Sequence, residues 1–225
     1  MPEQTLPKER TTPIPGIDPE AMPLLGLGIG LTGLALGLRP RFAPLPLALT
    51  ALAAAFYRDP KRQTPHDPGT LFALADGVVL RVEEVYEHRF IHSDCLRLSI
   101  NMTPLSVPVC RSPAAGVVRL VEHITGEFRP AGDPDAGDRN ERIYIGLHTD
   151  WGPLLVTMVA GPLARRLICR VSAGDRLDSG ARLGTVRFGA RADLYVQRDS
   201  AHFAVGPGVR LVAGITPLGE VAPLP

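Results

Sequence analysis

Arginine is the side chain in this sequence best placed to do chemistry, and two short segments that contain it are candidates for a binding site. Arg165 and Arg166 are adjacent, and Asn140, Glu141 and Arg142 follow one another. A guanidinium group binds phosphate or carboxylate through two parallel hydrogen bonds, so either cluster could hold an anionic ligand. The alternative is an ion network in which Arg165 and Arg166 pair with Glu141 at the edge of a strand.

Lysine is nearly absent, which excludes several kinds of catalysis. The chain has 24 basic residues, and its only lysines are Lys8 and Lys61. Neither lies among the strands expected below. No lysine is therefore placed to form a Schiff base with pyridoxal phosphate, or to carry biotin or lipoate.

Charge and cysteine spacing exclude two further kinds of site. The formal net charge is +1, so the positive field typical of nucleic-acid binding is missing and we expect no nucleic-acid partner. Cys95, Cys110 and Cys169 have no C-x-x-C spacing, which favours a reduced compartment and argues against a zinc site. His148 and Asp150 resemble a metal pair only loosely. We interpret them as part of a turn and expect no metal.

The front of the chain is apolar. Residues 1–20 are polar and rich in proline, so we expect a disordered lead. Residues 21–38 and 42–56 carry no charge and are separated by Arg39-Pro40-Arg41. Each run is borderline or short for a lone span of about 20 residues, so two half-depth or tilted helices fit better.

These two runs predict attachment to a membrane. The alternatives are a buried helical hairpin in a soluble protein and a cleaved signal peptide. Three basic residues, Arg58, Lys61 and Arg62, follow the second run and favour the cytoplasmic face of the cell membrane. We expect peripheral or hairpin-anchored attachment there.

From about residue 70, short β-branched runs alternate with Gly and Pro, a pattern typical of strands and turns. The expected strands cover 71–85, 97–102, 116–124, 142–147, 154–159, 166–171, 185–188, 192–196 and 209–218. Residues 76–85 and 115–124 echo each other, which predicts two related strand pairs. In 174–184, two glycines bracket a turn, as in barrel-sandwich hairpins. We therefore expect a mainly β domain of barrel-sandwich-like paired hairpins over 57–225, after a helical hairpin over 21–56.

Seven segments of this body carry motifs. They are YRDPKR at 57–62, ADGV at 75–78, LSINMTPLSVPVCRSPAAG at 98–116, NER at 140–142, VAGPLARRLIC at 159–169, GDRLDSG at 174–180 and LGTVRFGARADLYV at 183–196. In this order and spacing they resemble the phosphatidylserine decarboxylase family in its short bacterial and archaeal form. The resemblance covers nearly the whole body.

The resemblance implies conversion of phosphatidylserine to phosphatidylethanolamine by a pyruvoyl group that the chain makes from itself. In the family, a serine within F-G-S-R attacks the preceding carbonyl, the chain is cut, and the new N-terminus becomes the pyruvoyl group. Its ketone forms a Schiff base with the substrate and withdraws the electrons left when carbon dioxide departs. An aspartate and a histidine assist these steps.

This sequence departs from the family pattern where the chemistry is done. The serine position is Ala190, after Gly189, and alanine has no side-chain oxygen. The histidine position is Pro108. Ser106 and Cys110 replace an aspartate and an asparagine of the family.

Asp76 keeps its catalytic identity in this resemblance, although it could instead cap the turn at the glycine that follows it. Two explanations exist for Ala190: natural decay of the cleavage machinery, or an engineered change that traps the uncut precursor. We favour natural decay, because an engineered change would not account for Pro108.

The sequence thus predicts a protein of phospholipid (phosphatidylethanolamine) biosynthesis that forms no pyruvoyl group as written. It would act as a phospholipid-binding or partner-subunit pseudoenzyme, with Arg165, Arg166, Asn140 and Arg142 as its substrate-binding residues. The implied partners are a phospholipid membrane and a second copy or an intact paralogue. The alternative is an active decarboxylase, either because residue 190 is serine in the natural gene or because other chemistry operates. A purely soluble β scaffold is the third interpretation.

Overall fold

The structure is a computed structural model, and it describes residues 14–163, 166–187 and 189–221. These residues divide between two compact units, with the boundary between Lys61 and Arg62. Of the lead predicted over 1–20, residues 1–13 lie outside the described residues. Pro19–Ala21 forms a short 3-10 helix, η1. The predicted domain boundaries stay predictions.

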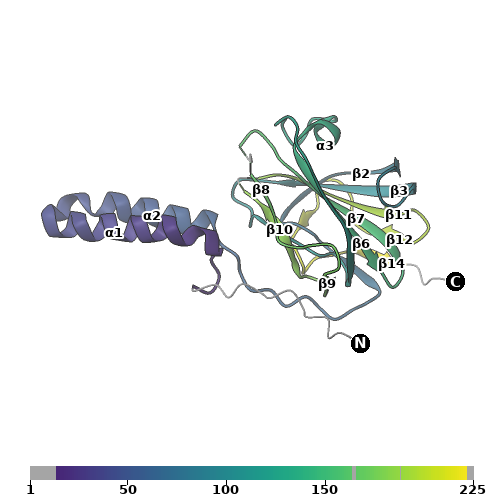
Figure 1. The fold of residues 1–225 in the computed structure, drawn as a ribbon, viewed down its shortest axis with the longest axis horizontal. Helices are drawn as coiled ribbons and strands as arrows, with labels where there is room; N and C mark the ends of the chain where they lie inside the picture. Colours follow the sequence, from purple (N-terminus) through teal and green to yellow (C-terminus); the bar gives the residue numbers. More distant parts are fainter. Residues whose placement is uncertain (1–13, 164–165, 188, 222–225) are drawn as a thin grey trace. The chain divides into compact units, whose positions relative to one another are not determined.

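The first unit is a pair of helices that run side by side in opposite directions (Figure 1). They are α1 (Met22–Leu38) and α2 (Pro44–Phe56), joined by the 3-10 turn η2 (Pro40–Phe42). Each helix has proline in its first turn, where no backbone N–H is needed. Helix α1 ends at Leu38, and Arg39 caps it in a non-helical conformation, because a residue before proline disfavours the helical region. The predicted N-terminal helical hairpin is confirmed.

Helix length and composition bear on membrane attachment. The continuous helical stretch Pro19–Leu38 has 20 residues and is long and apolar enough to cross a membrane. Pro40–Phe56 is a shorter apolar helix.

The second unit is built from antiparallel strands, which confirms the mainly β prediction. One sheet has eight strands in the order β13-β2-β3-β11-β7-β6-β5-β9, and two sheets have three strands, β1-β14-β12 and β4-β10-β8. The strands of the large sheet are β2 (Gly77–Glu87), β3 (Ser93–Met102), β5 (Gly116–Ile124), β6 (Arg142–Thr149), β7 (Gly152–Val159), β9 (Arg176–Leu177), β11 (Ala190–Gln197) and β13 (Arg210–Leu211). Those of the small sheets are β1 (Thr70–Phe72), β4 (Val109–Arg111), β8 (Leu167–Cys169), β10 (Arg182–Val186), β12 (Ala201–Phe203) and β14 (Pro217–Val221). A short helix, α3 (Ala136–Arg139), precedes β6.

The core lies against one face of the large sheet. Alternate residues of β3 and β11, such as Leu98, Ile100, Ala192 and Leu194, are fully buried in it. Because side chains alternate between the two faces of a strand, the residues between them face the other way. Those residues are largely polar, and they are described with the site below.

Two of the expected strands are interrupted. The strand expected over 209–218 is two strands, β13 and β14, because Gly214 turns the chain with a φ of +71°. The strand expected over 71–85 is likewise β1 and β2, with Asp76 in the bend between them. In both places an apolar run continues through a turn, so the pattern alone did not show the break.

Candidate functional site

Gly189 fixes the entry into β11. Its φ is +75°, a backbone conformation that residues other than glycine rarely adopt. A Cβ there would overlap the carbonyl oxygen of Met102 and lie 2.6 Å from the carbonyl carbon of Thr103. The next residue, Ala190, begins the strand and pairs with Met102 of β3. The backbone at 189–190 is therefore held tightly against the end of β3.

Three segments meet around Ala190. The residue is 5% exposed. A Cβ on Gly161, which follows β7, would lie 3.3 Å from the Cβ of Ala190 and 3.8 Å from the carbonyl oxygen of Arg129. The side chain at 190 is thus a buried methyl group in a close-packed setting.

Pro108 and Ser106 lie between β3 and β4. Pro108 is buried, and its carbonyl oxygen accepts a 2.7 Å hydrogen bond from the backbone N–H of Val186. The Ser106 hydroxyl accepts a hydrogen bond from the Thr103 N–H at 3.1 Å and lies 2.9 Å from the Thr103 hydroxyl. Ser106 therefore closes its own turn, and Pro108 contributes only a backbone acceptor.

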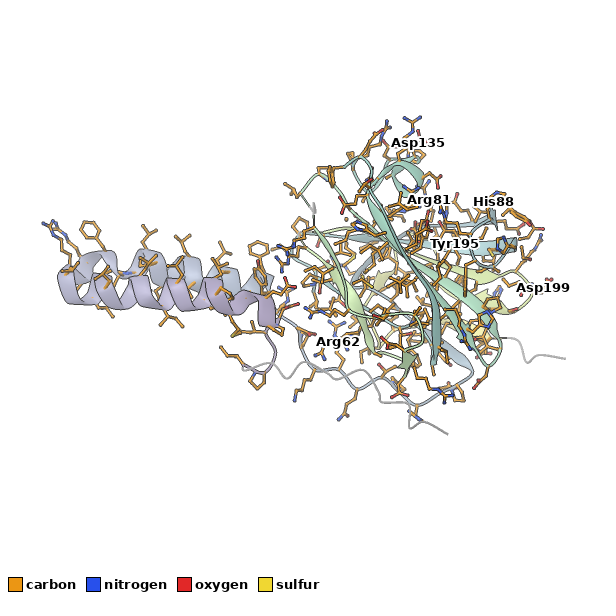
Figure 2. The ribbon with its side chains drawn as sticks, in the orientation of Figure 1. Arg62, Arg81, His88, Asp135, Tyr195 and Asp199 are labelled. Atoms are coloured by element: carbon orange, nitrogen blue, oxygen red, sulfur yellow. The ribbon has the colours of Figure 1, made fainter. Side chains whose placement is uncertain are left out.

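Asp76 lies just before β2 and is fully engaged by two distant parts of the chain. Arg62 Nη2 donates to Asp76 Oδ2 at 2.8 Å, and Arg62 Nη1 donates to Oδ1. The backbone N–H of Ala213 also donates to Oδ1 at 2.8 Å, while Arg62 Nη1 reaches the Ala213 carbonyl oxygen at 2.8 Å. These contacts join the start of the second unit to the segment between β13 and β14; Arg62 is labelled in Figure 2.

Strand order places Asp76 and Ala190 at the same end of the large sheet. Asp76 precedes β2 and Ala190 begins β11, and both strands pair with β3. Cys110 of β4 belongs to the same region. Complete burial raises the pKa of its thiol to about 12, with a further contribution from the Asp76 carboxylate. The thiol is therefore protonated at neutral pH and is no nucleophile there.

Asn140 and Arg142, two of the residues predicted to bind substrate, make internal contacts. The Asn140 amide donates to the carbonyl oxygens of Arg129 and Ala160, and its oxygen accepts from the Arg129 N–H, all at 2.9 Å. Arg142 is buried and donates at 2.8 Å to the Tyr144 hydroxyl and to the Asn140 carbonyl oxygen. Asn140 thus ties the loop of Arg129 to the segment that reaches Ala190.

The structure describes only one of the two arginines in the predicted anion-binding cluster at 165–166. Arg165 lies outside the described residues. Arg166 is exposed, and within the described part of the chain it forms no ion pair. Glu141, the alternative partner for these arginines, lies 3.0 Å from His123 Nε2 instead. A substrate-binding role for Arg165, Arg166, Asn140 and Arg142 stays a prediction.

The turn expected at His148 and Asp150 begins only at Asp150, because His148 lies within strand β6 and pairs with Val117 and Pro153. Thr149 Oγ1 donates to the Gly152 carbonyl oxygen at 2.7 Å, and the His148 ring lies edge-on to Phe90. Among the residues that the structure describes, no group of three or more His, Cys, Asp and Glu side chains is arranged to hold a metal ion.

A buried charge pair follows Ala190 directly. Arg191 and Asp193 of β11 are both fully buried, and Arg191 Nε donates to Asp193 Oδ1 at 2.7 Å. Arg191 Nη2 also donates to the Ser99 hydroxyl at 2.9 Å. Gly137 of α3 covers the guanidinium group, since a Cβ there would lie 3.3 Å from Nη2.

This pair belongs to a polar face of the large sheet. The register aligns one row of side chains across six strands: Arg81, Ser99, Asp193, Thr157, Tyr144 and Glu122. Arg81 and, from the next row, Tyr195 are labelled in Figure 2. Burial raises the pKa of Tyr195 well above its ordinary range. The spacing of residues along the sequence does not indicate this face, because it arises only when the six strands align.

The comparisons with known proteins agree on one family. The family described as "Phosphatidylserine decarboxylase" matches residues 49–219. The chain belongs to the phosphatidylserine decarboxylase family. Three similar proteins are each named "Phosphatidylserine decarboxylase proenzyme". The first, from Symbiobacterium thermophilum, is 40% identical over 92% of this chain and 96% of its own length. Those from Desulfotalea psychrophila (38%, 78% of this chain and 82% of its own) and Nocardia farcinica (36%, 93% and 89%) are slightly less similar.

The part of the chain that matches the phosphatidylserine decarboxylase family contains the whole site. Residues 49–219 include Asp76, Pro108 and Ala190, as well as Arg62 and the Arg191–Asp193 pair. Arg62 stands in the YRDPKR segment, and Arg191 and Asp193 stand in LGTVRFGARADLYV. Those motifs were the signal that could have pointed to these three residues.

Proposed function

We propose that this chain is a phospholipid-binding member of the phosphatidylserine decarboxylase family that does not cut itself and forms no pyruvoyl group. It works at the cytoplasmic face of the cell membrane, held there by its helical hairpin. The observation that carries this proposal is the buried methyl group of Ala190, which stands where the family's serine is expected.

The residues present do not fit a pyruvoyl group. The group is made from a side chain that supplies an oxygen to attack the preceding carbonyl, and Ala190 has none. The hydroxyls of Thr103 and Ser106, in the turn that follows β3, bind each other. Neither stands on the residue that follows Gly189, so neither can leave a new keto terminus there.

Pro108 supports the same conclusion independently. A histidine at this position could accept and return a proton, whereas the proline ring has no titratable nitrogen. Asp76, which keeps the family's residue type, holds Arg62 and the Ala213 N–H instead. The serine and the histidine needed for the family's chemistry are therefore missing, and the carboxylate of Asp76 is already hydrogen-bonded to other parts of the chain.

Lipid binding is supported by what borders residue 190. Gly189 packs on the Thr103–Pro104 backbone and Gly161 packs on Ala190. The same two loops present Leu105 and Leu163, which are 70% and 68% exposed, and Arg166 follows Leu163 closely. Exposed apolar side chains suit acyl chains, and an exposed arginine suits a phosphate group. A second copy or an intact paralogue is the partner we propose for it.

Two measurements on the full chain in phospholipid vesicles test this function. Intact-mass spectrometry is expected to find one uncut chain, and no carbon dioxide is expected from phosphatidylserine. A keto-blocked fragment that begins at residue 190, or release of carbon dioxide, would establish the active decarboxylase instead.

The binding part has its own test. A photoreactive phosphatidylserine is expected to label peptides that contain Leu105 and Leu163, with competition by unlabelled phosphatidylserine. Arg166→Ala is expected to weaken labelling, whereas Arg198→Ala, at another exposed arginine, is not. Equal labelling of all surface peptides, or no effect of Arg166→Ala, would overturn lipid binding at this site.

Variants separate the two losses. Ala190→Ser alone is expected to stay uncut, because Pro108 supplies no proton acceptor. Efficient cleavage of this single variant would show that Pro108 does not block the reaction. Ala190→Ser with Pro108→His tests whether the rest of the scaffold still supports the cut.

A further inference from the structure

The helical unit has a closed base. Ile17 and Arg58 form an antiparallel bridge. The Asp18 N–H donates to the Tyr57 carbonyl oxygen, and the Asp59 N–H donates to the Gly16 carbonyl oxygen, both at 2.8 Å. The chain therefore enters and leaves the hairpin at the same place, and both ends must lie on the same side of any membrane that the hairpin enters.

The two helical arms of the hairpin, Pro19–Leu38 and Pro40–Phe56, are apolar on all sides. Large exposed aliphatic side chains occur along both helices: Leu24, Leu27, Ile29, Leu31, Leu34, Leu36 and Leu38 on α1, and Leu45, Leu47, Leu49 and Leu52 on α2. Figure 2 shows side chains projecting from both helices along their length. A helix that lies in the plane of the interface needs a polar face, and these arms have none.

The few polar groups within the arms are satisfied inside them. Thr32 Oγ1 donates to the Gly28 carbonyl oxygen and Thr50 Oγ1 to the Pro46 carbonyl oxygen, both at 2.7 Å. Gly28 lies directly against Thr50 of the other helix, so the arms pack closely there. A hairpin of this kind can enter hydrocarbon without leaving an unpaired hydroxyl.

The arms are long enough to cross. Pro19–Leu38 has 20 helical residues, which span about 30 Å at about 1.5 Å per residue, equal to the hydrocarbon thickness of a typical bilayer. The second arm, Pro40–Phe56, is slightly shorter. Tilt and the flanking side chains accommodate that difference.

The charges at the tip decide how deep the hairpin goes. Arg39 and Arg41 are exposed on either side of Pro40. At half depth both guanidinium groups would lie near the bilayer centre, where a charged side chain is strongly disfavoured. Full crossing puts them among the phosphates of the opposite leaflet. Phe42, whose ring centroid lies 5.0 Å from the Arg41 guanidinium carbon, suits that interface.

We propose that the hairpin crosses the whole bilayer and that Arg39 and Arg41 bind phospholipid phosphates on the far side. The inference rests on the membrane attachment in the proposed function and chooses full crossing, where the sequence left half-depth or tilted helices open. Basic residues favour the cytoplasm for the base: Lys8, Arg10, Arg58, Lys61 and Arg62 flank it, against Arg39 and Arg41 at the tip.

Labelling of single cysteines in the full chain tests this topology. In a background with Cys95, Cys110 and Cys169 changed to alanine, Arg39→Cys is compared with Gln63→Cys, an exposed position on the base side. A membrane-impermeant maleimide is expected to label Arg39→Cys in intact cells and Gln63→Cys only in inverted vesicles. Arg41→Cys repeats the test if Arg39→Cys does not accumulate.

Each other pattern overturns the inference. Labelling of Arg39→Cys only in inverted vesicles would mean that the hairpin stays on the cytoplasmic side. Labelling only after detergent is added would place the tip inside the hydrocarbon. For the phosphate contact, Arg39→Lys with Arg41→Lys is expected to keep labelling of Leu38→Cys from outside, and Arg39→Glu with Arg41→Glu to reduce it; equal labelling would refute that contact. None of these results depends on cleavage or on phosphatidylserine binding, so the two proposals fail separately.

Discussion

Arg62 holds Asp76 through a two-pronged ion pair in which Nη2 donates to Oδ2 at 2.8 Å. Their side chains are 10% and 17% exposed, so solvent screens the pair only partly. Through Ala213 the same carboxylate reaches a third segment. Asp76 therefore links the beginning of the strand unit to its C-terminal part. This structural role does not require the family's histidine or serine, whose positions are Pro108 and Ala190.

Asp76→Asn is expected to lower the free energy of unfolding by about 2 kcal/mol, because charge-assisted hydrogen bonds lose their charge. Denaturant unfolding of the full chain in detergent, followed by fluorescence of Trp151, the only tryptophan, measures this change. Asp199→Asn, at an exposed turn, serves as the control. A double-variant cycle with Arg62→Gln that shows no coupling would contradict the assignment.

Gly189→Ala is expected to destabilise the protein by about 3 kcal/mol, because positive φ strain adds to overlap with the end of β3. Gly132→Ala is the matched control, since a Cβ there meets nothing within 4 Å. The same unfolding measurement compares the two variants. Equal stability of the two would show that the Met102–Pro104 backbone yields easily.

Replacing one partner of the Arg191–Asp193 pair is expected to cost about 3 to 5 kcal/mol, because the other charge is left buried. Arg191→Met and Asp193→Asn test this, and the joint replacement Arg191→Met with Asp193→Leu is expected to be milder than the sum. The control is Arg198→Gln, whose ion pair with Glu84 is more than half exposed and contributes at most about 1 kcal/mol. A loss as small for Arg191→Met as for Arg198→Gln would contradict the role of the pair.

Alkaline pH is expected to weaken the fold through Cys110. Its pKa rises from 9.0 to about 12 on burial, so between these values the native state keeps a proton that the unfolded state has lost. The contribution of Cys110 to stability is therefore fully present below pH 9. Above pH 9 the free energy of unfolding falls by up to about 1.4 kcal/mol per pH unit. Unfolding curves of the wild type and Cys110→Ala across this range measure the difference. Identical slopes would show that the Cys110 thiol does not contribute.

Local residue patterns were enough to predict the helices and strands whose own sequence is uniformly apolar or alternates regularly. The uncharged runs became α1 and α2, and β5 covers Gly116–Ile124, the range expected from its β-branched alternation. The polar face was not predictable in this way. The Arg191–Asp193 pair is buried because β11 lies between β3 and β7. The Arg62–Asp76 pair is held in place partly by the hydrogen bond from Arg62 to the distant Ala213 carbonyl oxygen. Such long-range pairing leaves no periodic trace in the sequence.

The position of β11, between β3 and β7 near the middle of the large sheet, has a kinetic consequence. Its only covalent link to the preceding strands passes through residues 189 and 190. While that link is intact, recovery from denaturant is a unimolecular process whose rate is independent of protein concentration. A polypeptide severed there would have to recruit its central strand from solution, so its recovery would slow on dilution.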